Sequence, residues 1–293
     1  MRIIDSQVHI VGRSTPDRPW VTDLQSSVGG ALGAATARHF GDDALISAEQ
    51  MLSAMDAVGV FGAVLVVTTH YGFDNRYSLD AAAAYPDRFR VVGKVDPAAP
   101  DLDEQVAAWR RDPLAGALRF LLLSDDHRAQ LLDGYFDAFL ASCARHGVPV
   151  SVYPAGHLDA LGQMVRRFDD LVWIIDHMGL SQPPVLQPDP EPFERLPELL
   201  ALADVPGVVV KLSGMPTLSR RPYPHDDLKR PFAALMEAFG AERLLWGSDW
   251  TRTRSVLPYQ PNVTFLTDLG LLSGEDRALI FEGNVRRIME WPA

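Results

Sequence analysis

Short apolar runs rich in β-branched residues recur along the whole chain, and amphipathic segments at helical spacing lie between them. Eight of these runs are candidate strands, at residues 3–9, 62–67, 89–95, 115–120, 148–153, 171–175, 207–212 and 243–247. Strands that are apolar on both faces and alternate with helices are typical of a parallel sheet. Eight such units in 293 residues indicate one closed (β/α)8 barrel. The first strand is not followed by the three spaced glycines of a dinucleotide-binding sheet, which disfavours an open doubly wound fold.

The expected helices span residues 48–58, 79–85, 103–111, 135–146, 158–168, 192–202 and 228–239. Two connections are longer than the others: residues 12–43 after the first strand and the proline-rich residues 179–191 after the sixth. Both follow the carboxyl end of a strand, which is where barrel enzymes build their sites, so we expect them to wall a substrate site. We predict a single α/β domain over residues 1–293, a TIM barrel distorted by long loops after strands 1 and 6.

The composition restricts the class of partner. A formal net charge of −11 argues against nucleic acid and anionic membranes, because both require a basic protein face. No apolar run approaches the roughly 18 residues that span a bilayer, and no leader precedes the first strand, so we expect a cytoplasmic protein. The only cysteine, Cys143, excludes an internal disulfide, and we interpret it as a buried, inert thiol. We expect a small-molecule substrate and, as the commonest assembly, a homodimer.

Polar residues end the predicted strands, and in a barrel they would ring one mouth. They are Gln7 and His9, Thr69 and His70, Asp96, Arg119, Tyr153, Asp176 and His177, Lys211 and Ser213, and Asp249. Among them, Asp249 is a carboxylate that ends an apolar strand and would face two imidazoles, His9 and His177. A carboxylate in that position can accept a proton from water. We therefore predict these three residues to be catalytic, with Asp249 as the base.

Arg119 lies in an otherwise apolar strand, where an unpaired guanidinium is costly to bury. It must face solvent, an acidic partner or an anionic ligand, and we favour the ligand. Other candidate substrate-binding residues, several of which would serve equally well as bridging residues, are Gln7, His70, Tyr153, Lys211, Trp250, Arg252 and Arg254.

Other ionisable residues are interpreted as structural. Asp5 and Asp176 are expected on the strand face opposite the histidines that follow them, which favours structural ion pairs. Four histidines lie in expected loops or helices, and we assign them no role in the site: His39, His127, His146 and His225. His157, just after the fifth strand, is left open.

Gln7 and His9 stand at positions i and i+2 of the first strand and therefore point the same way. Two histidines in these positions would grip one cation, but an amide oxygen is a poor ligand for a transition metal. The first strand therefore carries half of a metal-binding motif. Whether the protein uses a metal is the central question that the sequence raises.

Five motifs give the chain a family resemblance. They are IDSQVH at residues 4–9, IDHMG at 175–179, KLSG at 211–214, LWGSDW at 245–250 and GNVRR at 283–287. In this order, from first strand to last helix, the chain resembles the amidohydrolase superfamily in its amidohydrolase-related (amidohydrolase 2) branch. Within that branch it is most similar to lactonases that act on sugar lactones, muconolactones and pyrone dicarboxylates.

The resemblance implies a barrel in which Asp249 deprotonates the hydrolytic water. We expect His9 and His177 to hydrogen-bond the carbonyl oxygen, Arg119 to hold a substrate carboxylate, and Gln7 to orient substrate or water. The chain departs from the family at Gln7 and at Tyr153, where a metal-binding histidine is common. His9, His177 and Asp249 can still hold one divalent metal such as zinc, although we favour a site with no cofactor.

Without a Lewis acid, an activated ester is a more reasonable substrate than an amide, which favours lactone hydrolysis. Two alternatives remain at this stage. One is a metal-dependent decarboxylase of an aromatic or muconic acid in the same branch. The other is a non-catalytic barrel that binds a ligand after losing its metal site.

Overall fold

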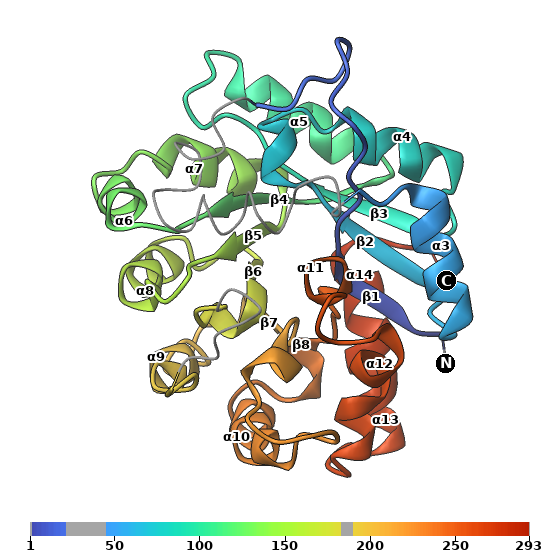
Figure 1. The fold of residues 1–293 in the computed structure, drawn as a ribbon. Coiled ribbons are helices and arrows are strands. Elements are labelled where there is room, and N and C mark those ends of the chain that lie inside the picture. Colours follow the sequence, from blue (N-terminus) through green and yellow to red (C-terminus); the bar gives the residue numbers. More distant parts are fainter. Residues whose placement is uncertain (1, 22–44, 183–189, 293) are drawn as a thin grey trace.

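The computed structural model describes residues 2–21, 45–182 and 190–292, and these contain one sheet of eight parallel strands. The strands follow one another around the sheet in chain order: β1 (Ile4–Val8), β2 (Gly62–Val66), β3 (Phe89–Gly93), β4 (Ala115–Leu121), β5 (Val150–Tyr153), β6 (Trp173–Ile175), β7 (Val208–Lys211) and β8 (Leu244–Leu245). Figure 1 shows them around a common centre with the helices outside. The predicted (β/α)8 barrel is confirmed.

The barrel is distorted where its last strand meets its first. β8 has only two residues, and the closure continues beyond it through individual backbone hydrogen bonds. The Ser6 N–H donates to the Trp246 carbonyl at 3.2 Å, and the Asp249 N–H donates to the Gln7 carbonyl at 2.9 Å. These bonds hold Asp249 directly beside the polar end of β1.

The helices of the described residues are α3 (Ala48–Ala57), α4 (Arg76–Ala84), α5 (Leu102–Arg111), α6 (Asp125–Leu132), α7 (Asp137–His146), α8 (Leu158–Arg167), α9 (Leu196–Leu200), α10 (Lys229–Phe239), α11 (Trp250–Thr253), α12 (Tyr259–Asp268), α13 (Gly274–Ala278) and α14 (Asn284–Ile288). Most match the expected segments. The expected helix at 192–202 is reduced to α9, and α4 begins three residues before its expected start at 79. No helix in the described ranges is long and apolar enough to cross a membrane.

α6 is a helix that the sequence analysis did not predict. Its sequence, DDHRAQLL, buries only Leu131, so it lacks the apolar periodicity on which the prediction rests. Its start is instead fixed by a cap, in which the Ser124 side chain accepts a hydrogen bond from the His127 N–H. Of the two long loops, residues 22–43 and 183–189 lie outside the described residues.

The barrel interior is layered, and the layers follow the period of two along each strand. Apolar side chains that include Val92, Ala117, Ile174 and Val209 form the cluster inside the sheet, against α14 and Trp291. Two residues further along the same strands stand Lys94, Arg119, Asp176 and Lys211. A charged layer therefore lies above the apolar one, toward the carboxyl ends of the strands.

Candidate active site

Asp176 is the centre of the charged layer. Its Oδ2 accepts a hydrogen bond from Arg119 Nε at 2.7 Å, and its Oδ1 lies 3.0 Å from both Lys211 Nζ and Ser151 Oγ. All three charged side chains are buried. Burial alone would raise the pKa of Asp176, but Lys211 and Arg119 outweigh it and lower that pKa to about 2. The expected ion pair is confirmed, but Asp176 belongs to the inward layer and not to the far face of the strand.

Gln7 connects this layer to β1. Lys211 Nζ donates to Gln7 Oε1 at 2.9 Å, and Gln7 Nε2 lies 3.4 Å from His9 Nε2. His9 Nδ1 is 2.7 Å from the Val66 carbonyl, which only accepts, so Nδ1 carries the proton of the neutral ring. The Nε2 lone pair of His9 therefore faces Gln7 and Asp249.

Asp249 is fully buried between cationic and neutral groups. Its Oδ2 pairs with Arg252 Nε, and its Oδ1 lies 3.4 Å from His9 Nε2. Within the described residues, Oδ1 has no hydrogen-bond partner. Burial would raise the pKa of Asp249, but the Arg252 guanidinium, the largest of the opposing causes, lowers it well below the usual range. The carboxylate is thus ionised at neutral pH, with one oxygen available as an acceptor.

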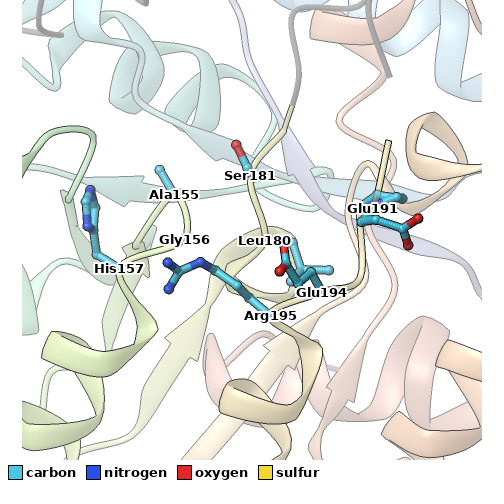
Figure 2. Close-up of a pocket in the computed structure, with 9 residues that line it drawn as sticks. Ala155, Gly156, His157, Leu180, Ser181, Glu191, Glu194 and Arg195 are labelled. Carbon is cyan, nitrogen blue, oxygen red and sulfur yellow. The ribbon is translucent and has the colours of Figure 1, made fainter. Parts of the chain in front are cut away.

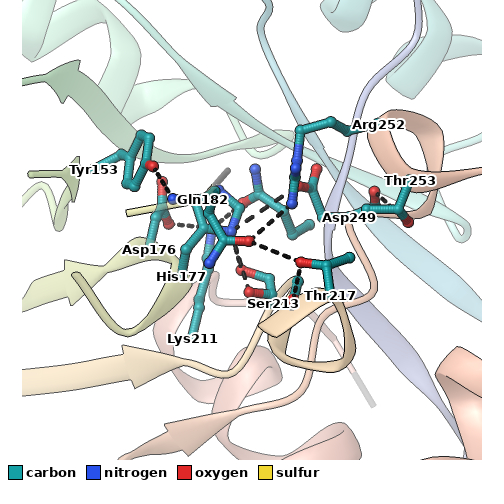
Figure 3. A network of polar contacts seen from close by, with 12 residues as sticks. Tyr153, Asp176, His177, Gln182, Lys211, Ser213, Thr217, Asp249, Arg252 and Thr253 are labelled. Atoms are coloured by element: carbon teal, nitrogen blue, oxygen red, sulfur yellow. Dashed lines mark hydrogen bonds and ion pairs between the residues drawn. The ribbon is translucent and has the colours of Figure 1, made fainter. Parts of the chain in front are cut away.

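His177 also lies beside Asp249, and Figure 3 shows these two side chains with Arg252 and Ser213. His177 Nδ1 lies 2.9 Å from Ser213 Oγ and 4.0 Å from Asp249 Oδ2, and its ring meets the edge of Tyr153 at a centroid distance of 4.9 Å. Burial lowers the pKa of His177 to about 4, so the ring is neutral at neutral pH. The catalytic residues predicted from the sequence, His9, His177 and Asp249, are therefore brought together.

His177, which follows β6, and Asp249, which follows β8, both have left-handed backbone conformations. φ is +54° at His177 and +52° at Asp249, and Met178 follows at +58°. Such conformations cost free energy in residues other than glycine and persist where the surrounding structure enforces them. At these positions the His177 and Asp249 side chains lie beside each other, with Nδ1 and Oδ2 4.0 Å apart.

Asp5 joins the end of β1 to the segment that follows β8. It accepts hydrogen bonds from the backbone N–H groups of Gln7 at 3.0 Å and Ser248 at 2.8 Å, from the Ser248 hydroxyl, and from the Tyr259 hydroxyl at 2.8 Å. Burial raises its pKa to about 6 despite these bonds. The expected ion pair for Asp5 is wrong among the described residues, because its partners are neutral donors that tie β1 to the segment after β8.

The donor set fits a divalent metal poorly. The described residues contain no group of three His, Cys, Asp or Glu side chains arranged to hold an ion. Gln7 Oε1, the one candidate oxygen of the first strand, is bound to the Lys211 ammonium. Asp249 Oδ2 is bound to the Arg252 guanidinium. A divalent cation at His9 and Asp249 would have to compete with two fixed positive charges.

Among the residues that the structure describes, two cavities can be placed at the carboxyl ends of the strands. The larger one, of about 540 Å³, is lined by residues that follow β2, β3 and β4, including Thr69, Phe73, Lys94, Arg119 and Phe136. Since Arg119 also contacts Asp176, this cavity adjoins the charged layer. The smaller one, of about 250 Å³, lies beside β5 and β6 and is shown in Figure 2.

The remaining predicted residues are spread around the mouth. His70 is buried against Trp20, and Trp250 stacks on Tyr259 at a centroid distance of 4.9 Å. Asp96 accepts a hydrogen bond from the Ala98 N–H at 2.9 Å and shapes a turn. His157, left open above, lines the smaller cavity.

The four histidines assigned no role have different outcomes. His127, which the sequence analysis assigned no role in the site, lines the larger cavity. His146 pairs with Asp103, and His225 Nδ1 lies 2.9 Å from the Arg221 carbonyl. His39 lies outside the described residues.

Three residues of this region were missed by sequence reasoning. Lys94 would have been found by extending the period of two beyond Val92. Thr251, whose hydroxyl accepts the His9 N–H at 2.9 Å, carries no such signal. Gln182, which accepts a hydrogen bond from Arg252 Nη2 at 2.9 Å, carries no signal in the sequence either. Only the fold brings Thr251 to His9 and Gln182 to Arg252.

Comparison with known proteins identifies relatives of this chain. Residues 4–290 match the amidohydrolase family. The chain is similar to an L-fucono-1,5-lactonase of Burkholderia ambifaria, with 35% identity over 203 residues, 67% of each chain. It is 28% identical to a 4-sulfomuconolactone hydrolase of Hydrogenophaga intermedia over 82% of this chain and 78% of that one. A crystal structure of a zinc-bound amidohydrolase from Burkholderia multivorans covers all of both chains, with a TM-score of 0.79 and 24% identity.

Proposed function

The chain belongs to the amidohydrolase family, and from that premise we propose that it is a lactonase that opens the cyclic ester of a small carboxylated or sugar-acid substrate. Relatives named for lactone hydrolysis support this activity. The observation that carries the proposal is the buried, ionised carboxylate of Asp249, whose Oδ1 lacks a hydrogen-bond partner among the described residues and lies 3.4 Å from His9 Nε2.

In the proposed reaction, a water hydrogen-bonded to Asp249 Oδ1 attacks the lactone carbonyl carbon as Oδ1 accepts its proton. The His9 lone pair faces the same place, so we assign His9 to orienting this water and not, as first expected, to the carbonyl oxygen. The tetrahedral intermediate then collapses, the ring C–O bond breaks, and the departing oxygen takes the proton back from Asp249. The product is an open-chain hydroxy acid.

His177 is the proposed donor to the developing oxyanion. His177 Nδ1 lies 2.9 Å from Ser213 Oγ and 3.2 Å from the Ser213 carbonyl. The proposed role requires the tautomer in which the Ser213 hydroxyl donates to Nδ1, which leaves Nε2–H to donate to the oxyanion. Since burial lowers the pKa of His177 to about 4, this donor is a neutral imidazole at neutral pH. Lys211 and Arg119 add positive potential from the charged layer.

The low pKa of Asp249 restricts the chemistry. A strongly acidic carboxyl is a weak base, and Brønsted behaviour makes weak bases inefficient catalysts. Such a base suits an activated ester and not an amide. We propose that the reaction needs no resident metal, because Lys211 binds the Gln7 oxygen, Arg252 binds one of the two Asp249 oxygens, and both cations would repel a metal ion at the remaining ligands.

The test is Asp249→Asn, assayed on a panel of sugar lactones and muconolactones. We expect kcat to fall roughly 10²- to 10⁴-fold, the usual contribution of a general base, while the hydroxy-acid product still binds. Dialysis against EDTA should leave wild-type kcat/KM within about twofold. Unchanged kcat in Asp249→Asn would refute the role of Asp249. Activity lost with EDTA and restored by zinc would refute the metal-free reaction, and release of carbon dioxide from an aromatic acid would favour a decarboxylase.

A further inference from the structure

Lys94 is a buried lysine that the reaction proposed above does not use. It follows β3, and its side chain is enclosed, with 7% of the residue exposed. The Asn75 side chain fixes its backbone by two hydrogen bonds, one to the Lys94 carbonyl at 2.8 Å and one from the Lys94 N–H at 2.9 Å. Nζ donates to the Thr68 carbonyl at 2.8 Å. An ammonium has three donors, and among the described residues only one of them has an acceptor.

The charges around Lys94 do not balance. Arg119 and Lys211 both pair with Asp176, whereas Lys94 has no carboxylate partner within the described residues. Burying charge without a partner is costly. The same imbalance is reflected in the pKa of Lys94, which burial, aided by Arg119, lowers to about 7. An anion beside Lys94 and Arg119 would restore the balance.

The cavity of about 540 Å³ provides the space for such an anion. Lys94 and Arg119 both line it, and much of the rest of its wall is apolar or aromatic, including Phe73, Phe120 and Phe136. Phe120 and Phe136 stack within this wall at a centroid distance of 4.6 Å. A neutral, polyhydroxylated sugar lactone would bring no acid group to Lys94 and would place hydroxyls against these rings.

We propose that Lys94, together with Arg119, binds the acid group of the substrate, and that the substrate is therefore an unsaturated or otherwise apolar lactone that carries a carboxylate or a similar acid. This inference rests on the proposed lactonase activity and narrows its substrate class. Lys94 would determine substrate specificity by binding the acid group at the non-reacting end of the substrate, while Asp249 acts at the ester.

The experiment compares two lactones with the same scissile ester, muconolactone and its primary amide. The proteins are the wild type, Lys94→Met, Lys94→Arg and, as the matched control, Lys229→Met, which removes a partly exposed lysine on α10. We expect the wild type to prefer the acid over the amide. In Lys94→Met the ratio of kcat/KM for acid and amide should fall about 10- to 100-fold, mainly through KM of the acid, as loss of a charged hydrogen bond implies. Lys94→Arg should keep part of the preference, and Lys229→Met all of it.

Two results would overturn the inference: a wild type that prefers the amide, or a Lys94→Met ratio equal to that of the wild type. If Lys94→Met does not fold, the wild-type preference and Lys94→Arg still decide. Calorimetric titration with phenylacetate separates this inference from the proposed function. If no lactone is hydrolysed but phenylacetate binds the wild type and not Lys94→Met, the lactonase proposal fails and the acid-binding subsite stands. If the wild type hydrolyses lactones but does not bind phenylacetate, the lactonase proposal stands and the acid-binding subsite fails.

Discussion

Replacing Asp176 by asparagine removes the only carboxylate that Arg119 and Lys211 share among the described residues, and the structure sets the size of the effect. Lowering the pKa of Asp176 from 3.8 to about 2 corresponds to roughly 2 to 3 kcal/mol in favour of the charged carboxyl in the folded state. Breaking a buried ion pair by removing one partner costs about 3–5 kcal/mol. Asparagine keeps the volume and one oxygen that can accept from Ser151. We therefore expect Asp176→Asn to lose about 3 kcal/mol of unfolding free energy.

Urea unfolding at pH 7 measures this loss, and its pH dependence tests the cause. The pKa of Asp176 is depressed in the folded state, so its contribution is fully present above the unfolded pKa of 3.8 and is lost as the pH falls through about 2. The difference between wild type and Asp176→Asn should stay constant from pH 8 to about 5 and shrink below about pH 4.

Asp159→Asn is the matched control, because it removes a carboxylate from an exposed pair with Arg128. Surface pairs of this kind contribute about 0–1 kcal/mol. If Asp176→Asn costs no more than Asp159→Asn, or if its cost does not change below pH 4, the charged layer does not stabilise the barrel in the way argued here.

Three further predictions concern single residues. The ring of His177, followed by NMR in labelled protein with His177→Gln for assignment, should titrate near pH 4, and a midpoint near 6.5 would contradict its burial. Cys143 is fully buried and burial raises its pKa, so a thiol reagent should label the native protein at least about 100-fold more slowly than the urea-unfolded chain; fast labelling would disprove this. In Gly247→Ala the new Cβ would lie 2.7 Å from Ser6 Oγ and 3.1 Å from Gln7 Cβ, so we expect a loss of about 1–3 kcal/mol in unfolding free energy and a drop in kcat. Gly274→Ala, with open space around its Cβ, is the control, and equal effects would refute the steric argument.

The sequence was sufficient for the barrel because its signals are local. Each strand is a short β-branched run, and parallel strands in chain order follow from the helices between them. The same local pattern extends to part of the site. The period of two that makes Ile174 an inward residue also makes Asp176 inward, so its pairing with Arg119 was accessible from the sequence.

The rest depended on tertiary structure. The left-handed conformations of His177 and Asp249 are imposed by the surrounding structure, and neither residue type predicts such a conformation. α6 lacks an apolar periodicity that would predict a helix, and a serine such as Ser124 is too common in the sequence to predict a helix start by itself. The bonds that Asp5 makes to Ser248 and Tyr259 join residues more than 240 positions apart. Such long-range partners are fixed by the closure of the barrel and leave no trace in spacing.

Gln7, Lys211 and Arg252 are best understood together. Where the resemblance leads one to expect a histidine that faces a cation, Gln7 offers its oxygen to the Lys211 ammonium and its nitrogen to His9. Arg252 binds one oxygen of Asp249 and leaves the other facing His9. Positive charge that a metal would bring is thus built into the chain as fixed side chains, close to the proposed hydrolytic water. Because these cations also depress the pKa of Asp249, the same arrangement limits the base to esters that are already reactive.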